Sequence, residues 1–479
     1  MASDTATNPG ATMDDGFSVR SIFSEAMSSS SATNAPRAPP AEPPRRVVPP
    51  PAKTTVDVSR TSTRVSRFSI SGVSRIRQGF LSSLLQPAFE AKTIKEAVDE
   101  AREAAGKLRA LGIAKAVVVQ MDKSADKDAL DVHFHCQDGS RYIIKTGVDV
   151  GDSEGMASVT GRLNNIWGGG ESFEANYARG SKTQAAFQGT LSIPVEADPR
   201  KKIDIVANQA VLDNRPYSSH DELRRTLSMA YRAEGRSGSH EVLYSLSWRD
   251  VCNLGAKASP SLRTDAGHTL KSSLGYTFTC DNRDSPTVPS TGSYARVAAE
   301  FAGIGGDVVF GKSHVELQSN QSLGRGYVLS SSVHGGLLWG PQTSIVDRFF
   351  VGGSTSVRGF EYRGIGPRDG EDSIGGDVFY AAGLSLLTPL PFVTNDALKG
   401  HLWANAGQCA LLDRRGLGRP GVSGEIARFL TSPSASVGFG LVYRHSMVRV
   451  ELSCCLPIVA TSTDRPKSGM HFGLGFQFL

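Results

Sequence analysis

The chain has 479 residues, and its 52 basic and 47 acidic residues leave a formal net charge of only +5. This balance argues against the strongly basic class of nucleic-acid binders. No uninterrupted apolar run approaches the roughly 18 residues that a transmembrane helix needs. Membrane β-strands remain possible, because only alternate residues of such strands face lipid and each strand gives a weak signal.

Residues 1–63 are expected to be a disordered tail. The stretch 28–55 is rich in Pro, Ser and Ala and nearly free of large apolar residues, so it cannot bury enough surface to order itself. No short apolar core followed by a small-residue cleavage site occurs near the start, and a secretory signal peptide is therefore not expected. The six cysteines show no CxxC spacing, which predicts free thiols.

Residues 64–150 are predicted to form a small α+β domain in the order β-α-α-β-β. The clearest element is a helix over 93–112, in which Thr93 and Glu96 have the spacing of a capping box. Gly112 is well placed to end it. A shorter helix over 77–89 is expected to break at Pro87. Strands are expected at 66–73, 114–122 and 129–137.

His133 and His135 share one face of the last of these strands. Two possible ligands on one strand, with no third ligand elsewhere in the sequence, make a poor metal site. An exposed strand face is the better interpretation, and no metal or other cofactor is expected.

Residues 151–479 differ in pattern, because almost every segment alternates apolar and polar residues. Leu227, Met229 and Tyr231 share one face, for example. Alternation of this kind indicates strands with one apolar and one polar side. Sixteen candidate strands are centred near 160, 175, 187, 207, 228, 245, 260, 274, 297, 314, 333, 382, 404, 438, 451 and 474.

A soluble sandwich or barrel would need only about eight strands and would bury its apolar face. Sixteen such strands have no obvious second layer to cover them. In a membrane barrel, lipid covers the apolar face and closure removes the edges. We therefore predict a transmembrane β-barrel of about 16 antiparallel strands.

A loop over residues 340–376 interrupts the strands and contains "SVRGFEYRGIGPRDG" (356–370), with three arginines and four glycines. The longer string "DRFFVGG…SVRGFEYRGIGPRDG…IGGDVFYAAGLSLLTPLPF" resembles the barrel subunits of the mitochondrial sorting and assembly machinery (SAM). That family belongs to the outer-membrane barrel-assembly, or bacterial surface antigen, superfamily. The resemblance covers about residues 65–479 and includes one polypeptide-transport-associated (POTRA) domain. Further matching segments are 267–284, 305–317 and the C-terminal "FGLGFQFL".

The resemblance implies that this loop tucks into the barrel lumen and that its arginine pairs with inward polar groups of later strands. Glu451 is predicted to face inward beside Arg449 and Ser453, so we expect it to pair with Arg358. Asn405 stands where bacterial relatives carry an aspartate, and we expect it to support the pair. The motif residues are Val357, Arg358, Gly359 and Phe360.

The resemblance also implies a lateral seam between strand one (157–165) and strand sixteen (470–478). Glycines there either weaken strand pairing or relieve crowding at closure, and the sequence does not distinguish the two. The segment 471–478 also fits the C-terminal signal that the family's clients carry. The seam residues are expected to be Ala157, Val159, Gly161, Leu163, Gly473, Gly475, Phe476 and Phe478.

The function implied is folding and insertion of β-barrel precursors into the mitochondrial outer membrane, with the POTRA domain in the intermembrane space. The expected partners are barrel precursors, accessory subunits of the assembly complex and the lipid bilayer, but no nucleic acid. No Ser-His-Asp arrangement, P-loop or dinucleotide fingerprint points to an enzyme.

Three alternatives stay open. A bacterial relative would need an export signal and usually several POTRA domains. A chloroplast outer-envelope relative would fit the Ser/Ala/Thr-rich tail, although the acidic residues of that tail argue against a transit peptide. A passive porin would need neither a POTRA domain nor a lumenal loop of this kind.

Overall fold

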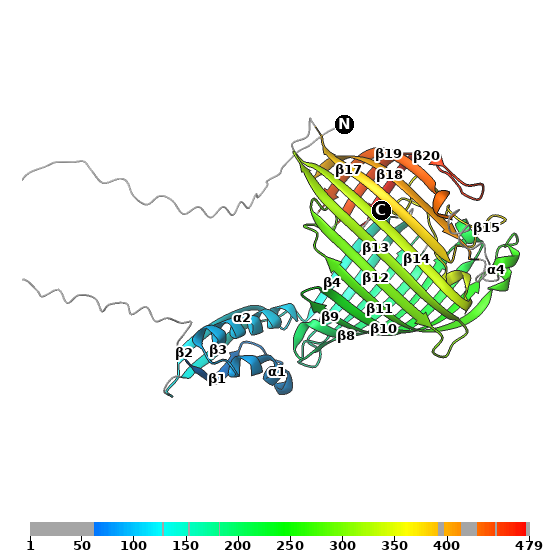
Figure 1. Ribbon diagram of the computed structural model, residues 1–479. Helices are drawn as coiled ribbons and strands as arrows, with labels where there is room; N and C mark the ends of the chain where they lie inside the picture. The colour runs from blue at the N-terminus through cyan, green and yellow to red at the C-terminus, as the bar shows by residue number, and fades with distance from the viewer. Residues whose placement is uncertain are drawn as a thin grey trace, which may run out of the picture. The chain divides into compact units, whose positions relative to one another are not determined.

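The computed structural model describes residues 62–126, 129–151, 154–181, 183–390, 397–412, 429–445 and 448–475 (Figure 1). The predicted tail, residues 1–63, lies almost wholly outside these residues. Within them, no helix is both long and apolar enough to cross a membrane.

The first described segment is a small α+β unit with the predicted order of elements. It comprises β1 (Arg64–Ser71), α1 (Gln78–Phe89), α2 (Ile94–Ala110), β2 (Ala114–Lys123) and β3 (Ala129–Asp138). The strands form one sheet in the order β1-β3-β2. Apolar side chains of both helices and of the sheet form its core, including Leu84, Leu108 and Phe134.

Local sequence sets the ends of α2. Thr93 Oγ1 accepts a hydrogen bond from the Glu96 backbone N at 3.2 Å, and Glu96 Oε2 accepts one from the Lys92 N at 2.9 Å. Gly112 follows the helix with a φ of +70°, a conformation that glycine adopts without steric cost. The predicted break at Pro87 is wrong, because α1 continues through it to Phe89. Pro87 lies in the last turn of α1. The helix therefore loses only one backbone hydrogen bond, the one that Pro87 cannot donate to the carbonyl four residues earlier.

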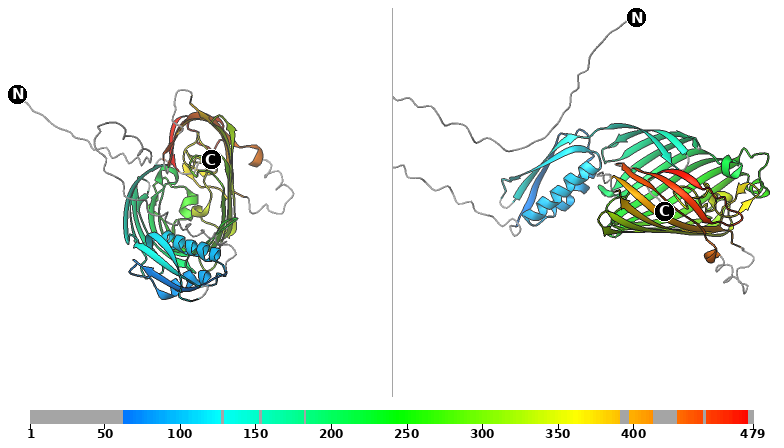
Figure 2. Two further views of the ribbon diagram at one scale, coloured as in Figure 1. Left: turned by 90° about the vertical axis from the view of Figure 1, so that its left-hand side faces the viewer. Right: turned by 90° about the horizontal axis from the view of Figure 1, so that it is seen from above.

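The rest of the described chain forms a 16-stranded antiparallel sheet that curls into a barrel (Figures 1 and 2). Each strand pairs with its neighbours in the sequence, and residues 343–377 lie between β14 and β17. The strands are β4 (Tyr142–Gly151), β5 (Glu154–Asn164), β6 (Ser172–Gly180), β7 (Thr183–Val195), β8 (Asp198–Asp213), β9 (Asp221–Gly235), β10 (Gly238–Cys252), β11 (Gly267–Asp281), β12 (Gly292–Ala302), β13 (Val309–Gly324), β14 (Tyr327–Gln342), β17 (Val378–Pro389), β18 (Leu398–Ala410), β19 (Ser434–His445), β20 (Val448–Val459) and β21 (Gly469–Gly475).

The predicted alternation is confirmed along these strands. On β20, Leu452 is 40% exposed, while its neighbours Glu451 and Ser453 are each 2% exposed. Leu227, Met229 and Tyr231 on β9 are likewise exposed. The apolar residues therefore point away from the barrel interior, as the face of a membrane barrel requires.

One predicted strand position is wrong and one strand was not predicted, although sixteen is the right number. The candidate near 260 is the short helix α4 (Pro260–Thr264), in which the Ser259 Oγ accepts from the Leu262 N at 3.4 Å. Ser-Pro is a typical start for a helix, since proline is well suited to the first helical position. The missed strand is β4, which pairs with β5 along its whole length. The boundary expected at residue 150 therefore falls inside the barrel sheet's first hairpin.

Residues 343–377 lie inside the barrel, where the end-on view of Figure 2 shows irregular segments within the ring of strands. They contain one 3-10 turn, η1 (Ile345–Asp347), and a minimal hairpin of β15 (Arg368–Asp369) and β16 (Asp372–Ser373). A second short helix, α3 (Arg215–Ser218), contacts this hairpin through Ser218, whose Oγ donates to the Ser373 carbonyl at 2.6 Å. Apolar side chains of the loop form a buried cluster with the inner wall. The cluster includes Val351, Val357, Phe360, Ile365, Phe310, Leu338 and Cys409.

Candidate functional site: the lumenal loop and the strand edges

The Val357–Phe360 motif is buried within the barrel. Arg358 is only 1% exposed, and Val357 and Phe360 are equally buried. An arginine so deeply enclosed needs a partner, because an uncompensated buried charge costs several kcal/mol.

The partner is Glu451 on β20, as predicted. Arg358 Nη2 donates to Glu451 Oε2 at 3.2 Å, and Arg358 Nε lies 3.0 Å from Oε1. Two guanidinium nitrogens thus lie next to the two carboxylate oxygens, an arrangement that lysine cannot reproduce.

Glu451 also gathers donors from the barrel wall. Arg449 Nη2 donates to Oε2 at 3.1 Å, and Ser453 Oγ donates to Oε1 at 2.8 Å. His401 Nδ1 on β18 lies 3.1 Å from Oε1, and since a carboxylate only accepts, this nitrogen carries the proton. The loop therefore contacts a polar surface that spans β18 and β20.

The ring of Trp403 lies beside the Arg358 guanidinium. The Arg358 guanidinium carbon lies 5.2 Å from the centre of its ring, within the range of a cation–π interaction. Room for the ring comes from Gly438, where an added Cβ would lie 2.4 Å from a Trp403 ring atom. His401 and Trp403 were not among the predicted partners of Arg358. They were recognisable, because they precede Asn405 by four and two residues and so share its face of the strand.

Asn405 contacts the loop backbone. Its Nδ2 donates to the Ser356 carbonyl oxygen at 3.1 Å, two residues before Arg358. Ser436 Oγ donates to the carbonyl oxygen of Arg358 itself. Gly359 follows with a φ of +81°, so the chain can turn there without the strain that a side chain would introduce.

A second buried ion pair anchors the beginning of the loop to a distant part of the wall. Arg249 Nη1 on β10 donates to Asp347 Oδ1 at 2.6 Å, and both side chains are at most 3% exposed. Lys312 Nζ adds a hydrogen bond to the Asp347 carbonyl at 2.8 Å. This pair was not predicted, because nothing in the sequence of either segment indicates which strand lies opposite the loop.

The loop also pairs with the segment that leads into the last strand. The Glu361 N donates to the Arg465 carbonyl at 3.0 Å, and the Arg465 N donates to the Gly364 carbonyl at 2.8 Å. The Lys467 N donates to the Gly359 carbonyl at 2.8 Å. These backbone bonds connect the Arg358 motif to the start of β21.

The two edges of the barrel sheet are β4 and β21. They lie near each other, but no ladder joins them in the described residues. Their apolar side chains are among the most exposed of the barrel, with Ile144 at 78% and Met470 at 74%. An unpaired edge of this kind is a template for another strand.

This arrangement corrects the predicted composition of the seam. Strand one is β4, and the four residues expected there belong to β5, the second strand. The reason is that residues 142–151 pair with β5 from Tyr142 opposite Leu163 to Gly151 opposite Glu154, and so belong to the barrel sheet and not to the α+β unit. The residues that were predicted on strand one and lie on β5 are Ala157, Val159, Gly161 and Leu163. On the other side, Gly473 and Gly475 lie on β21 as expected, whereas Phe476 and Phe478 lie outside the described residues.

The two histidines of β3 lie beside serines of β1. His133 Nδ1 is 2.5 Å from Ser69 Oγ, and His135 Nδ1 is 3.0 Å from Ser71 Oγ. All six cysteines are free thiols.

Comparison with known proteins places this geometry in context. Residues 165–478 match the Omp85 superfamily domain. A SAM50-like protein of Schizosaccharomyces pombe is 34% identical over 439 residues, covering 87% of this chain and 90% of that protein. The human sorting and assembly machinery component 50 homolog is 32% identical over 429 residues, with 87% and 90% covered. The crystal structure of BamA from Haemophilus ducreyi lacking POTRA domains 1-3 has a TM-score of 0.72 at 15% identity, covering 86% of this chain and 85% of that one.

Proposed function

Because the chain belongs to the Omp85 superfamily and has SAM50 proteins as relatives, we propose that it folds and inserts β-barrel precursors into the mitochondrial outer membrane. The resemblance to the SAM barrel subunits is confirmed by these relatives. The proposed work is strand pairing rather than bond chemistry, so no catalytic residues or cofactor are assigned.

The observation that carries the proposal is that no ladder joins the edge strands β4 and β21 in the part of the chain that the structure describes. Each backbone group left without a hydrogen bond in lipid costs several kcal/mol. An arriving strand that pairs with β4 removes this cost for both partners. The edges therefore favour strand addition from the side of the barrel, where a precursor can grow one hairpin at a time.

The proposed exchange partner of an incoming strand is β21. Segment 471–478 fits the client signal pattern, and an arriving signal strand of the same pattern competes with it for β4. The loop bonds at Glu361, Gly364 and Gly359 hold the segment before Gly469. We infer that these bonds and the Arg358–Glu451 pair keep the start of β21 in place while its far end exchanges.

The remaining assignments follow from the same proposal. The α+β unit of residues 64–138 is assigned as the single POTRA domain, located in the intermembrane space. Accessory subunits of the assembly complex and barrel precursors are the proposed partners, and the 16 strands of the barrel sheet, from β4 to β21, form the membrane-embedded part.

The proposal is tested by crosslinking at the corrected edge. Thr146 is exposed on β4, in register with Val159 of β5. A Thr146→Cys variant, in a background whose native cysteines are replaced by serine, is expected to form a disulfide with a cysteine placed in the signal strand of an imported barrel precursor. Val242→Cys, exposed on β10, is the matched control and should form none.

Depletion of the protein provides the functional readout. Newly imported precursors are expected to stall before membrane integration. Normal integration after depletion, or equal crosslinking at Thr146 and Val242, would contradict the proposal. A conductance that ignores added signal peptide would instead favour the passive porin.

A further inference from the structure

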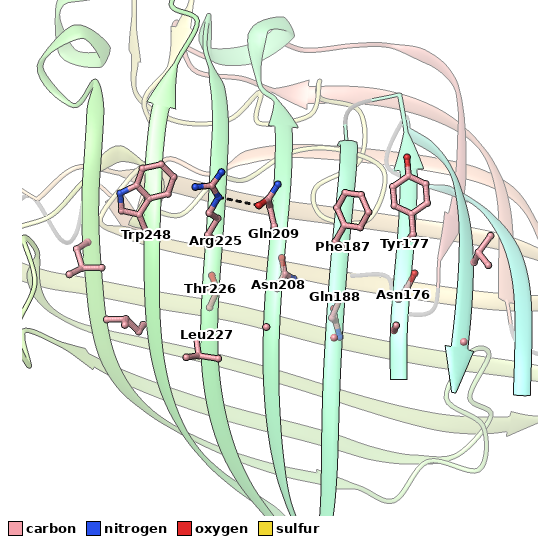
Figure 3. Close-up of a pocket in the computed structure, with 17 residues that line it drawn as sticks. Asn176, Tyr177, Phe187, Gln188, Asn208, Gln209, Arg225, Thr226, Leu227 and Trp248 are labelled. Carbon is pink, nitrogen blue, oxygen red and sulfur yellow. Dashed lines mark hydrogen bonds between the residues drawn. The ribbon is translucent and has the colours of Figure 1, made fainter. Parts of the chain in front are cut away.

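The outward face of β5 to β10 contains a groove of about 1000 Å³ (Figure 3). Its trough is a row of small residues that are direct partners on four consecutive strands. The row runs from Gly161 to Ala175, then to Gly189 and Ala207. An added Cβ at Gly161 would meet nothing within 4 Å, so the trough is open to its surroundings.

A second row forms one wall of the groove and carries the larger side chains. Phe187 pairs with Gln209, Gln209 with Arg225, and Arg225 with Trp248. Figure 3 shows these side chains side by side, with the Arg225–Gln209 hydrogen bond drawn. The groove thus combines an apolar trough with a wall that contains one cation.

The Arg225 guanidinium is held in place but not neutralised by its neighbours. Its Nε donates to Gln209 Oε1 at 3.1 Å, and its guanidinium carbon lies 5.0 Å from the centre of the Trp248 ring. Among the described residues, no carboxylate lies within ion-pair distance of it. Asp250, further along β10, lies 3.2 Å from the His268 Nδ1.

The position of Arg225 along its strand sets its depth. It is four residues past Asp221, the first residue of β9. With a rise of about 3.3 Å per residue and a tilt of about 40°, it lies roughly 10 Å along the barrel axis from the strand end. The neighbouring Trp248 is of the aromatic type that flanks the apolar band of membrane barrels at the level of the lipid headgroups, which places Arg225 near that level.

We propose that this groove binds one anionic phospholipid, with its phosphate on Arg225 and an acyl chain along the trough of small residues. A guanidinium presents paired N–H groups that match a phosphate. Because Gln209 and Trp248 are neutral, the positive charge favours a lipid with net negative charge over a zwitterionic one. The site lies on the barrel's outer face and includes no residue of β4 or β21.

The test is native mass spectrometry of the purified full chain in detergent, with dioleoyl phosphatidylglycerol or dioleoyl phosphatidylcholine added. We expect one phosphatidylglycerol to be retained in preference to phosphatidylcholine. Arg225→Gln should weaken that binding about tenfold, the usual worth of a charged hydrogen bond, and Arg225→Lys should weaken it less. Gly161→Leu should reduce the binding of both lipids, since it fills the trough.

Arg179→Gln is the matched control, because Arg179 is an exposed arginine on β6 that does not line the groove. It should leave lipid binding unchanged. Heat-dependent mobility on a gel verifies that each variant is folded. Three results would overturn the proposal. The unmodified protein could retain the two lipids equally, or Arg225→Gln could bind phosphatidylglycerol as well as the unmodified protein does. An equal loss in Arg179→Gln would indicate that surface arginines attract anionic lipid in general. Precursor insertion by Arg225→Gln is measured separately, so that a failure of the lipid proposal can be distinguished from a failure of the proposed assembly function.

Discussion

Replacing Glu451 by glutamine removes one charge from the lumenal cluster with almost no change in shape. In the structure, Oε2 receives the guanidinium nitrogens of Arg358 at 3.2 Å and Arg449 at 3.1 Å. At about 3 Å and an effective dielectric constant of about 20, each pair contributes about 5 kcal/mol before desolvation is subtracted. Loss of one partner of a buried pair has a net cost of about 3–5 kcal/mol, so Glu451→Gln is expected to lower the unfolding free energy by that amount.

The assay is urea unfolding of the full chain in detergent micelles, followed by tryptophan fluorescence. A double-mutant cycle compares the unmodified protein with Arg358→Gln, Glu451→Gln and the combination. Because the two residues contact each other directly, the combined loss should fall short of the sum of the single losses by about 1–3 kcal/mol. Glu361→Gln is the matched control, since Glu361 forms an exposed pair with Arg465, and such pairs contribute at most about 1 kcal/mol.

Two results would refute this reasoning. A coupling energy within about 0.5 kcal/mol of zero would mean that Arg358 and Glu451 act independently. A loss for Glu451→Gln no larger than that for Glu361→Gln would mean that burial does not strengthen the lumenal pair.

Three further predictions use the same protein. Gly359→Ala should lower the urea midpoint, because the φ of Gly359 is +81° and an added Cβ would lie 3.0 Å from the Ser436 Cβ. A non-glycine residue in this left-handed conformation costs about 1–2 kcal/mol. An unchanged midpoint would contradict this prediction. Arg249→Gln should lower the unfolding free energy by about 3–5 kcal/mol, since it leaves Asp347 buried without its ion pair. It should also speed proteolysis within the lumenal loop. Protease resistance equal to that of the unmodified protein would count against the Arg249–Asp347 pair as an anchor of the loop. Burial raises the pKa of the Cys136 thiol, so less thiolate is present at pH 7 and iodoacetamide should alkylate it more slowly in the folded chain than in urea; equal rates in a variant with Cys136 as its only cysteine would disprove this.

The location of the lumenal site was predictable only in part. Arg358 is recognisable within a distinctive string, and Glu451 follows from period-two alternation on a strand near the C-terminus. His401 and Trp403 lie on the same face as Asn405, so the pattern contained them even though they were overlooked. Which of these side chains meets the loop depends on the curvature of the barrel, and alternation along a single strand carries no information about it.

The sequence by itself determined that the chain has an α+β unit followed by a barrel of alternating strands with an apolar exterior, because strand periodicity and helix capping are local properties of neighbouring residues. The predicted count of sixteen agreed because one false strand and one missed strand cancel. Only the tertiary structure decided that β4 is the first strand, that Pro260–Thr264 form a short helix, and that Arg249 and Asp347 meet. Strand edges and cross-barrel ion pairs depend on which segments become neighbours after the sheet has curled. Segments far apart in the chain leave no local signal of that proximity.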